Sequence, residues 1–153
     1  ILISESYELG SVLLKYEDQK LSVIWSDRNK ARNDKALMAH WATPIHHDGF
    51  IYGCSGRHTT DADIRCISFK TGEIVWTERR TARCTFLKVD GHILSLSENG
   101  ELRLFKLKPA NYEEVALWTT PDLEYPAWAP PVLVHGKLFL RGKDRLVCYK
   151  VGK

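Results

Sequence analysis

Short apolar segments alternate with polar, glycine-centred turns along the whole chain. The segments are rich in Val, Ile, Leu, Tyr and Phe, and this alternation is typical of β-hairpins. Asp48-Gly49, Asp90-Gly91 and Asn99-Gly100 favour two-residue type I′ turns, because both central positions of such a turn need a positive φ. His135-Gly136 occupies the same kind of place, and no long window shows helical periodicity. The pattern predicts an all-β chain.

The strand pattern repeats. The turn glycines Gly49, Gly91 and Gly136 recur at spacings of 42 and 45 residues, and a tryptophan closes each of three successive units. Four short antiparallel strands per period of about 40 to 50 residues are the signature of a β-propeller. We therefore predict an all-β β-propeller built of four-stranded antiparallel blades, as an incomplete ring of about three and a half blades.

The repeats divide the chain into segments of one partial propeller domain, residues 1–153. We assign a partial blade to 1–27, an inter-blade loop to 28–40, blades to 41–79 and 82–120, and a partial C-terminal blade to 127–153. A closed ring needs more blades than these. We therefore expect the chain to be the C-terminal part of a longer seven- or eight-bladed protein. Its open strand edges should pair with a partner or with a second copy, giving a homo-oligomer.

The inter-blade loop is longer than a hairpin connection and locally basic. It carries Arg28, Lys30, Arg32 and Lys35, with acidic residues mixed in. Long loops in compact domains are often functional or mobile. We expect a solvated, partly flexible loop, with a binding role as the alternative.

Residues 66–76, CISFKTGEIVW, form the most regular unit of the chain. They predict a strand, a tight turn at Thr71-Gly72, and a second strand that carries Trp76. A large flat ring can fill the wedge between the outer parts of two neighbouring blades. We therefore predict that Trp25, Trp76 and Trp118 dock each repeat against the next.

This unit resembles the tryptophan-docking repeat of pyrroloquinoline-quinone (PQQ)-type propellers, whose consensus is roughly A-x-D-x-x-T-G-x-x-x-W. Thr71, Gly72 and Trp76 match, whereas Cys66 and Ser68 depart from the Ala and the Asp. The closing stretch WAPPVLVHGKLFLRGKDRLVCYKV is similar to the last repeat of PQQ-like propellers of the outer-membrane-assembly-factor type. The resemblance implies a bacterial protein that is periplasmic or exported. The same repeat occurs in quinoprotein dehydrogenases and in non-enzymatic scaffolds.

Composition and charge limit the classes of partner that the chain can bind. The chain has 22 Lys and Arg against 19 Asp and Glu, a net charge of +3, and the two signs are interspersed. The basic residues therefore form no stripe that could follow a phosphate backbone, and we expect no nucleic-acid partner. No apolar run reaches the length of about 18 residues that a transmembrane helix needs.

Three residues at equivalent places before the inner strands could line one mouth of the propeller channel. Trp41, Arg83 and Trp128 each lie seven residues before the first residue of a predicted turn. Two rings and a guanidinium suit a planar or anionic ligand through stacking and charge-assisted hydrogen bonds. The alternative is that the three side chains pack between blades.

A second candidate is the connection GCSGRHTTDAD, which carries Arg57, His58, Asp61 and Asp63. His and Asp can bind a metal or move a proton, but Asp residues in a turn also bond to the local backbone. His46 and His47 are adjacent in a strand and point to opposite faces. No metal-ligand spacing motif occurs, so we expect no metal site.

Four cysteines permit disulfides in an exported protein. We expect Cys54 and Cys66 to lie roughly opposite each other in one hairpin, although cross-strand disulfides are geometrically demanding. Cys66 and Cys148 occupy matching positions in their repeats, and Cys84 begins a strand. We favour free, mostly buried thiols.

Two functions remain open. The resemblance implies that a quinoprotein dehydrogenase would hold PQQ with a vicinal cysteine pair, a tryptophan floor and a calcium site. The chain has no Cys-Cys pair and no assignable calcium cluster, so we predict no cofactor and no catalytic residue. We favour a non-catalytic scaffold for a protein or carbohydrate partner. The alternative is a PQQ- or quinone-dependent oxidoreductase whose ligands lie partly outside this chain.

Overall fold

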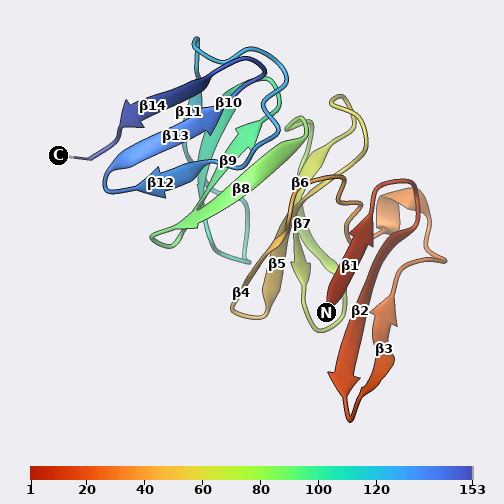
Figure 1. Ribbon diagram of the computed structural model, residues 1–153. Helices are drawn as coiled ribbons and strands as arrows, with labels where there is room; N and C mark the ends of the chain where they lie inside the picture. Colours follow the sequence, from red (N-terminus) through yellow and green to blue (C-terminus); the bar gives the residue numbers. More distant parts are fainter. Residues whose placement is uncertain (153) are drawn as a thin grey trace.

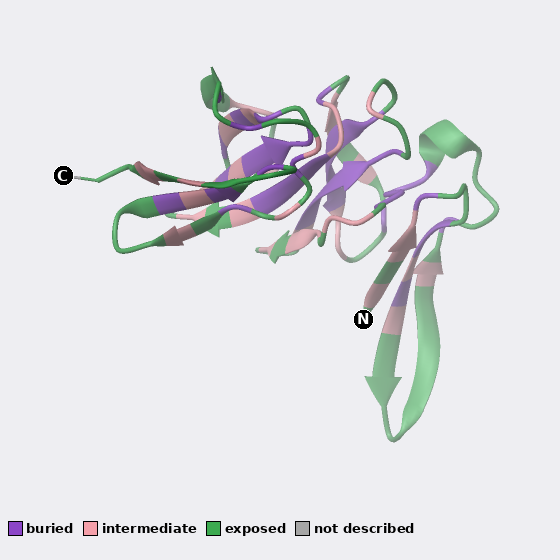
Figure 2. Ribbon diagram, turned by 45° about the horizontal axis from the view of Figure 1, so that its top comes forward, coloured by how far each residue is buried: buried purple, intermediate pink, exposed green. Residues whose placement is uncertain are grey.

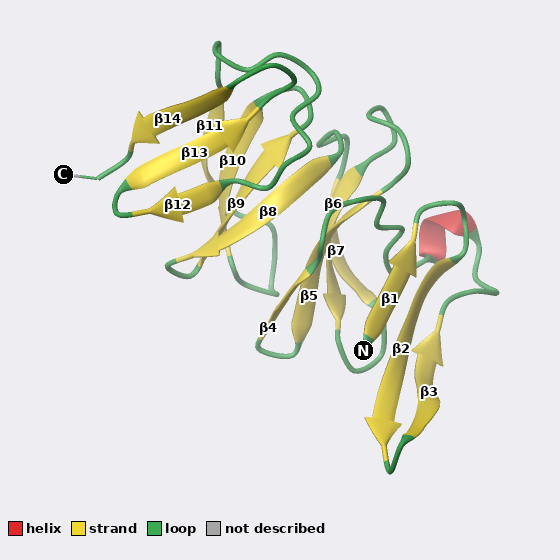
Figure 3. Cartoon of the chain, viewed as in Figure 1, coloured by secondary structure: helices red, strands yellow, loops and turns green. Residues whose placement is uncertain are grey.

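The computed structural model describes residues 1–152 as four antiparallel β-sheets arranged side by side, with one short 3₁₀ turn, η1 (Arg32–Asp34) (Figures 1 and 3). The first sheet has three strands, β1 (Leu2–Glu5), β2 (Gly10–Glu17) and β3 (Lys20–Ser26). The second has four, β4 (Ile45–His47), β5 (Phe50–Ser55), β6 (Asp63–Ser68) and β7 (Ile74–Glu78). The third has β8 (Cys84–Val89), β9 (His92–Ser97), β10 (Glu101–Lys106) and β11 (Glu114–Thr119). The fourth has β12 (Val132–Val134), β13 (Lys137–Arg141) and β14 (Leu146–Lys150).

The arrangement confirms the predicted β-propeller class. Within each sheet, every strand pairs with the next along the chain, so the four sheets are successive meanders. The first and fourth sheets lie at the two ends of the row, and within residues 1–152 no sheet closes on another (Figure 1).

Three of the four predicted type I′ turns are confirmed. Asp48-Gly49, Asp90-Gly91 and His135-Gly136 each have positive φ at both residues. The prediction for Asn99-Gly100 is wrong, because there only Gly100 has a positive φ, at 83°. Its N–H bonds to the carbonyl of Ser97 at 3.0 Å, which makes the connection a three-residue loop of the kind in which a glycine follows an ordinary turn.

The core lies between the sheets. Successive side chains of a strand point to opposite faces, and in β5 Ile51 and Tyr52 are both buried. Ile51 belongs to the cluster with Leu37 on the side of the first sheet, whereas Tyr52 belongs to the cluster with Phe105 of the third. The inner sheets are therefore buried on both faces, while the first sheet is largely exposed (Figure 2).

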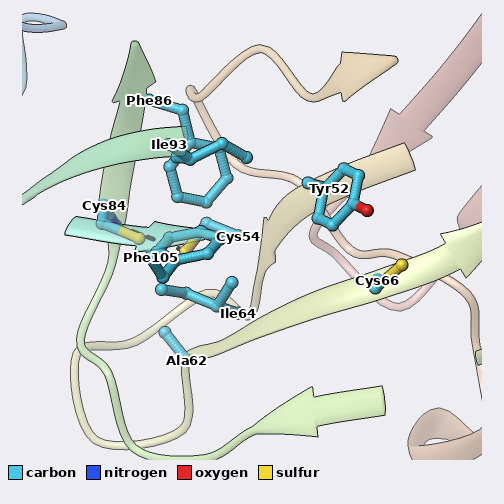
Figure 4. Close-up of a cluster of buried hydrophobic side chains, with 9 residues drawn as sticks. All are labelled: Tyr52, Cys54, Ala62, Ile64, Cys66, Cys84, Phe86, Ile93 and Phe105. Atoms are coloured by element: carbon cyan, nitrogen blue, oxygen red, sulfur yellow. Dashed lines mark hydrogen bonds between the residues drawn. The ribbon is translucent and has the colours of Figure 1, made fainter. Parts of the chain in front are cut away.

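The largest of these clusters joins the second and third sheets (Figure 4). Nine buried residues form it: Tyr52, Cys54, Ala62, Ile64, Cys66, Cys84, Phe86, Ile93 and Phe105. The Phe86 and Phe105 rings meet edge to face with centroids 6.3 Å apart, a favoured geometry for aromatic pairs.

The connection between the first two sheets is not a solvated loop throughout. Residues 35–39 are buried, and Ala36 and Leu37 join the core between these sheets. The carboxylate of Asp27 fixes the segment, accepting from the backbone N–H of Ser11 and of Ala36, each at 2.6 Å. The apolar residues at the end of the connection therefore pack against the first sheet and exclude water from it.

Each of the three strand-closing tryptophans contacts the following sheet. Trp25 donates its indole N–H to the carbonyl of Phe69 at 2.9 Å, and Trp76 donates to the carbonyl of Lys108 at 3.3 Å. The Trp118 ring meets that of Tyr149 edge to face at 5.1 Å. These contacts are what a docking role requires, and the role itself stays a prediction.

The turn beneath Trp25 is organised by its own side chains. The Ser68 hydroxyl, which stands where the consensus has Asp, accepts from the N–H of Thr71 at 3.3 Å. The Thr71 hydroxyl bonds to the Glu73 carboxylate at 3.1 Å. Gly72 follows with φ 71° and lies directly against the Trp25 ring.

All four cysteines are free, with Cys54, Cys66 and Cys84 buried and Cys148 exposed. The expectation that Cys54 lies opposite Cys66 is wrong, because the register pairs Cys54 with Ile64 and Cys66 with Tyr52. The nearest cysteine contact instead crosses sheets, where the Cys84 N–H lies 3.3 Å from the Cys54 sulfur.

Among residues 1–152, no helix has the length and apolar character that are needed to span a membrane.

Replacing Gly72 by Ala tests the contact with Trp25. An added Cβ would lie 2.7 Å from a Trp25 ring carbon, and the positive φ disfavours any side chain. We expect the free energy of unfolding to fall by about 2–4 kcal/mol in urea titrations, the sum of backbone strain and overpacking.

Gly49→Ala is the matched control. Gly49 has φ 80° but nothing within 4 Å of the added Cβ, so only the backbone cost of about 1 kcal/mol should remain. Equal losses in the two variants would show that the Trp25 contact contributes nothing.

Candidate functional site

Aromatic and arginine side chains form a continuous row across the ends of the sheets. The row contains Tyr7, His40, Trp41, Arg57, Arg83 and Trp128, and we call it the aromatic–arginine strip. Tyr7 comes from the β1–β2 turn, Arg57 from the β5–β6 connection and Arg83 from the residue before β8. The other members lie in the connections that lead into β4 and β12.

Each member contacts the next. The guanidinium of Arg57 lies 4.3 Å from the centre of the Tyr7 ring, which is 6.0 Å from the ring of His40. His40 is 5.2 Å from Trp41. These four residues lie in connections of the first two sheets.

The structure brings the three predicted mouth residues together. The Arg83 guanidinium lies 4.6 Å from the centre of the Trp41 ring, and the rings of Trp41 and Trp128 are 5.7 Å apart with 50° between their planes. Side chains that are more than 40 residues apart in sequence therefore meet at one place. Ligand binding by these residues stays a prediction.

A buried carboxylate holds the centre of the strip in place. Glu98, which directly follows β9, is fully buried. It accepts from Arg83 Nε at 2.7 Å, from Trp128 Nε1 at 3.2 Å and from the Thr59 hydroxyl. Arg83 also donates to the carbonyl of Arg57 at 3.0 Å. Both ends of the guanidinium are therefore fixed, and the rings above it share its rigidity.

The environment of Glu98 and Arg83 favours the charged form of each side chain. Burial raises the pKa of Glu98, but the hydrogen bonds from Arg83, Thr59 and Trp128 outweigh it, so the pKa is lowered overall. The pKa of Arg83 is raised, chiefly by its bonds to Glu98. Burial and then the charges of Arg83 and Arg57 lower the pKa of His40, so a neutral imidazole is favoured beside Trp41.

Part of the strip faces solvent. Trp128 is 50% exposed and Tyr7 is 56% exposed. Trp41 is partly buried, and its indole nitrogen is buried without a hydrogen-bond partner among the described residues. The strip offers aromatic faces and edges held by a fixed charge pair, rather than a nucleophile beside a base.

The four residues of the second predicted set do not all meet at one place, although Asp61 and Asp63 line a common pocket. Arg57 joins the strip, whereas the N–H of His58 bonds to the Asp61 carboxylate at 2.8 Å and closes the local turn. Asp63 is buried in β6, 3.5 Å from Arg65. Within residues 1–152 no group of three or more His, Cys, Asp or Glu residues is placed to hold a metal ion.

Sequence reasoning missed Glu98, Thr59, His40 and Tyr7. Each is a single polar or aromatic residue that does not recur with the blade period, and its role depends on contacts between sheets. The available signal was position: Glu98 lies beside the Asn99-Gly100 turn, at the same end of its sheet as Arg83.

Comparisons with known proteins identify the fold. No family model matches the chain, and no curated protein matches it. Its structure is similar to that of BamB, a β-propeller from Moraxella catarrhalis, with a TM-score of 0.60 and 12% identity, over 90% of this chain and 36% of that one. It is also similar to the computationally designed Ika8 protein, with a TM-score of 0.54 and 9% identity, over 92% of this chain and 42% of that one.

These similarities support the β-propeller fold and no more. The chain spans well under half the length of either structure, 36% of BamB and 42% of Ika8. At such low identity, residues of the strip cannot be transferred from one protein to another.

Replacing Glu98 by Gln should make stability less dependent on pH. Because the folded-state pKa of Glu98 is lowered, its charge contributes stability above the unfolded-state pKa of about 4.3. That contribution is lost as the pH falls through the lower folded-state value. We expect the variant to be less stable than the native chain by about 2 kcal/mol at pH 7, and the difference to shrink below about pH 4.

Urea titrations at several pH values measure this difference. Glu124→Gln, at an exposed position, is the control and should leave the profile unchanged. A difference between Glu98→Gln and the native chain that stays constant with pH would contradict an ionised, stabilising Glu98.

Proposed function

We propose that this chain is a non-catalytic β-propeller domain that binds a protein partner through the aromatic–arginine strip. The observation that supports this most directly is the unbroken row of contacts from Arg57 and Tyr7 to Trp41, Arg83 and Trp128. Tyr, Trp and Arg are the residue types most enriched at the energetic centres of protein interfaces.

The strip is also preorganised. Glu98 binds Arg83 and Trp128 at once, so these side chains are held before a partner arrives. Binding then loses less side-chain entropy than it would with free rotamers. A rigid surface with exposed rings and the exposed guanidinium of Arg57 suits a polypeptide that offers apolar and acidic side chains.

The fold agrees with a scaffold role. A propeller can present connections from several sheets on one rigid face, and strip residues here come from connections around all four sheets. This support is analogy at the level of fold, as is the periplasmic or exported location that we propose from the PQQ-like repeat.

The geometry does not favour the quinone-dependent alternative over the scaffold. The Trp41 and Trp128 rings already contact each other at 5.7 Å and are tilted by 50°. A planar quinone between them would have to separate the rings and disturb the Trp128 bond to Glu98. We therefore propose neither a PQQ nor a calcium site in this chain.

Selection from a displayed random-peptide library tests the proposal. We expect the native chain to retain peptides that bind saturably. Trp128→Ala should weaken them roughly 30-fold, as expected for a residue at the energetic centre of an interface. Val115→Ala, at a half-exposed site on β11, is the control and should bind them normally.

Two results would overturn the proposal. One is that no peptide is retained, or that every retained peptide is indifferent to Trp128→Ala. The other is saturable binding of a glycan or of PQQ with calcium, measured by calorimetry and lost in Trp128→Ala, without any peptide ligand. That result would replace the protein partner with the corresponding ligand.

A further inference from the structure

A pocket of about 580 Å³ lies beside the second sheet, away from the strip. Its wall is formed by the η1 connection, the β5–β6 connection, strands β6 and β7, and the β7–β8 connection. Four arginines line it, Arg32, Arg65, Arg79 and Arg80, and we call it the arginine pocket. It shares no lining residue with the strip.

The pocket carries more positive than negative charge. Its lining includes two carboxylates, of Asp61 and Asp63, against four guanidinium groups. Asp61 contacts Arg32, and Asp63 lies 3.5 Å from Arg65. No ion pair within residues 1–152 involves Arg79 or Arg80. Arg32 also lies 3.6 Å from the carboxylate of Glu8 outside the lining, so the surplus of two positive charges in the lining resides in Arg79 and Arg80.

Arg65 is an unusual wall residue because it is only 6% exposed. One terminal nitrogen donates to the carbonyl of Lys35 at 2.5 Å. Its Nε is buried and has no hydrogen-bond partner among the described residues. Buried donors are nearly always satisfied by protein, water or a ligand. The Arg65 guanidinium therefore has hydrogen-bonding capacity that the described residues leave unused.

The charges around Arg65 point the same way. Burial lowers the pKa of Arg65; Asp63 counteracts this, and the charge of Arg79 lowers it further. An anion placed between these guanidinium groups would relieve both the desolvation and the mutual repulsion.

The backbone fixes the two unpaired arginines at the rim. Arg80 has φ 59°, in the left-handed region that a non-glycine residue rarely adopts. Its N–H bonds to the Asp63 carboxylate at 3.1 Å, and the N–H of Thr81 bonds to the carbonyl of Ala62 at 3.1 Å. These bonds tie the β7–β8 connection to β6, and strained residues held in this way are concentrated at functional sites.

We propose that the arginine pocket binds a phosphate monoester of a small organic molecule. A phosphate monoester carries nearly two negative charges at pH 7, which matches the surplus. Its oxygens accept the paired N–H groups that a guanidinium presents. The volume lies within the range for small-molecule sites, and Met38 and Ile74 in the lining give an apolar wall for the organic group.

Calorimetric titration with phenyl phosphate at low ionic strength tests this proposal. We expect saturable binding at one site. The double variant Arg79→Gln/Arg80→Gln should weaken the affinity at least about tenfold, because it removes both unpaired charges. These side chains are exposed, so circular dichroism should show the fold unchanged.

The control is a second double variant that loses the same amount of positive charge outside the arginine pocket. The control Arg141→Gln/Arg145→Gln changes the end of β13 and the β13–β14 connection, at exposed positions outside the arginine pocket, and should bind phenyl phosphate as the native chain does. Equal weakening in both double variants would mean non-specific attraction to a basic surface and would overturn the proposal.

Two further probes measure the contributions of the phosphate group and of the organic group separately. Inorganic phosphate should bind several-fold more weakly than phenyl phosphate, because it makes no contact with the apolar wall, and phenol should not bind. Equal affinities for the two phosphates would overturn the organic part of the proposal. Absence of saturable phenyl phosphate binding by the folded chain would overturn the site itself. Neither outcome bears on the strip, whose test uses peptides.

Discussion

Burial of sheet faces against neighbouring sheets is the constraint on which this structure depends. A two-faced sheet such as β4–β7 has apolar residues on both sides, as Ile51 and Tyr52 show in adjacent positions of β5. Such a sheet cannot satisfy both faces unless another sheet packs on each. The first sheet lacks a neighbour on one side in this structure, and there Val23 and Ile3 are exposed.

The same stacking creates the strip. Sheets that stand side by side bring their connecting segments together at one end, so Trp41, Arg83 and Trp128 meet although no local sequence links them. A single buried acid then suffices to fix the group. Because Glu98 is desolvated, its hydrogen bonds to Arg83 and Trp128 are stronger than they would be in water.

The repetition of the blades along the sequence determines how much of the fold and of the strip could be predicted. The I′ turns and the strand-closing tryptophans recur with the blade period, so the turn at Asp90-Gly91 and the place of Trp76 at the end of its repeat could be predicted from one sequence. Non-repeated features were not. Glu98 and Arg65 take their roles from partners on other segments, and the burial of Leu37 follows from its contact with the first and second sheets rather than from its basic neighbourhood.

Arginine side chains have two different roles in this chain, and the role depends on whether a carboxylate pairs with the guanidinium. Arg83 is neutralised by a buried carboxylate, so its remaining contribution is to orient the Trp41 ring beside it. Arg79 and Arg80 have no carboxylate partner within residues 1–152, and they line the same pocket as Arg65, whose Nε is unpaired. A folded chain leaves such like charges together only at a cost. An anionic ligand would remove that cost, whereas the paired arginine of the strip is already satisfied before any partner binds.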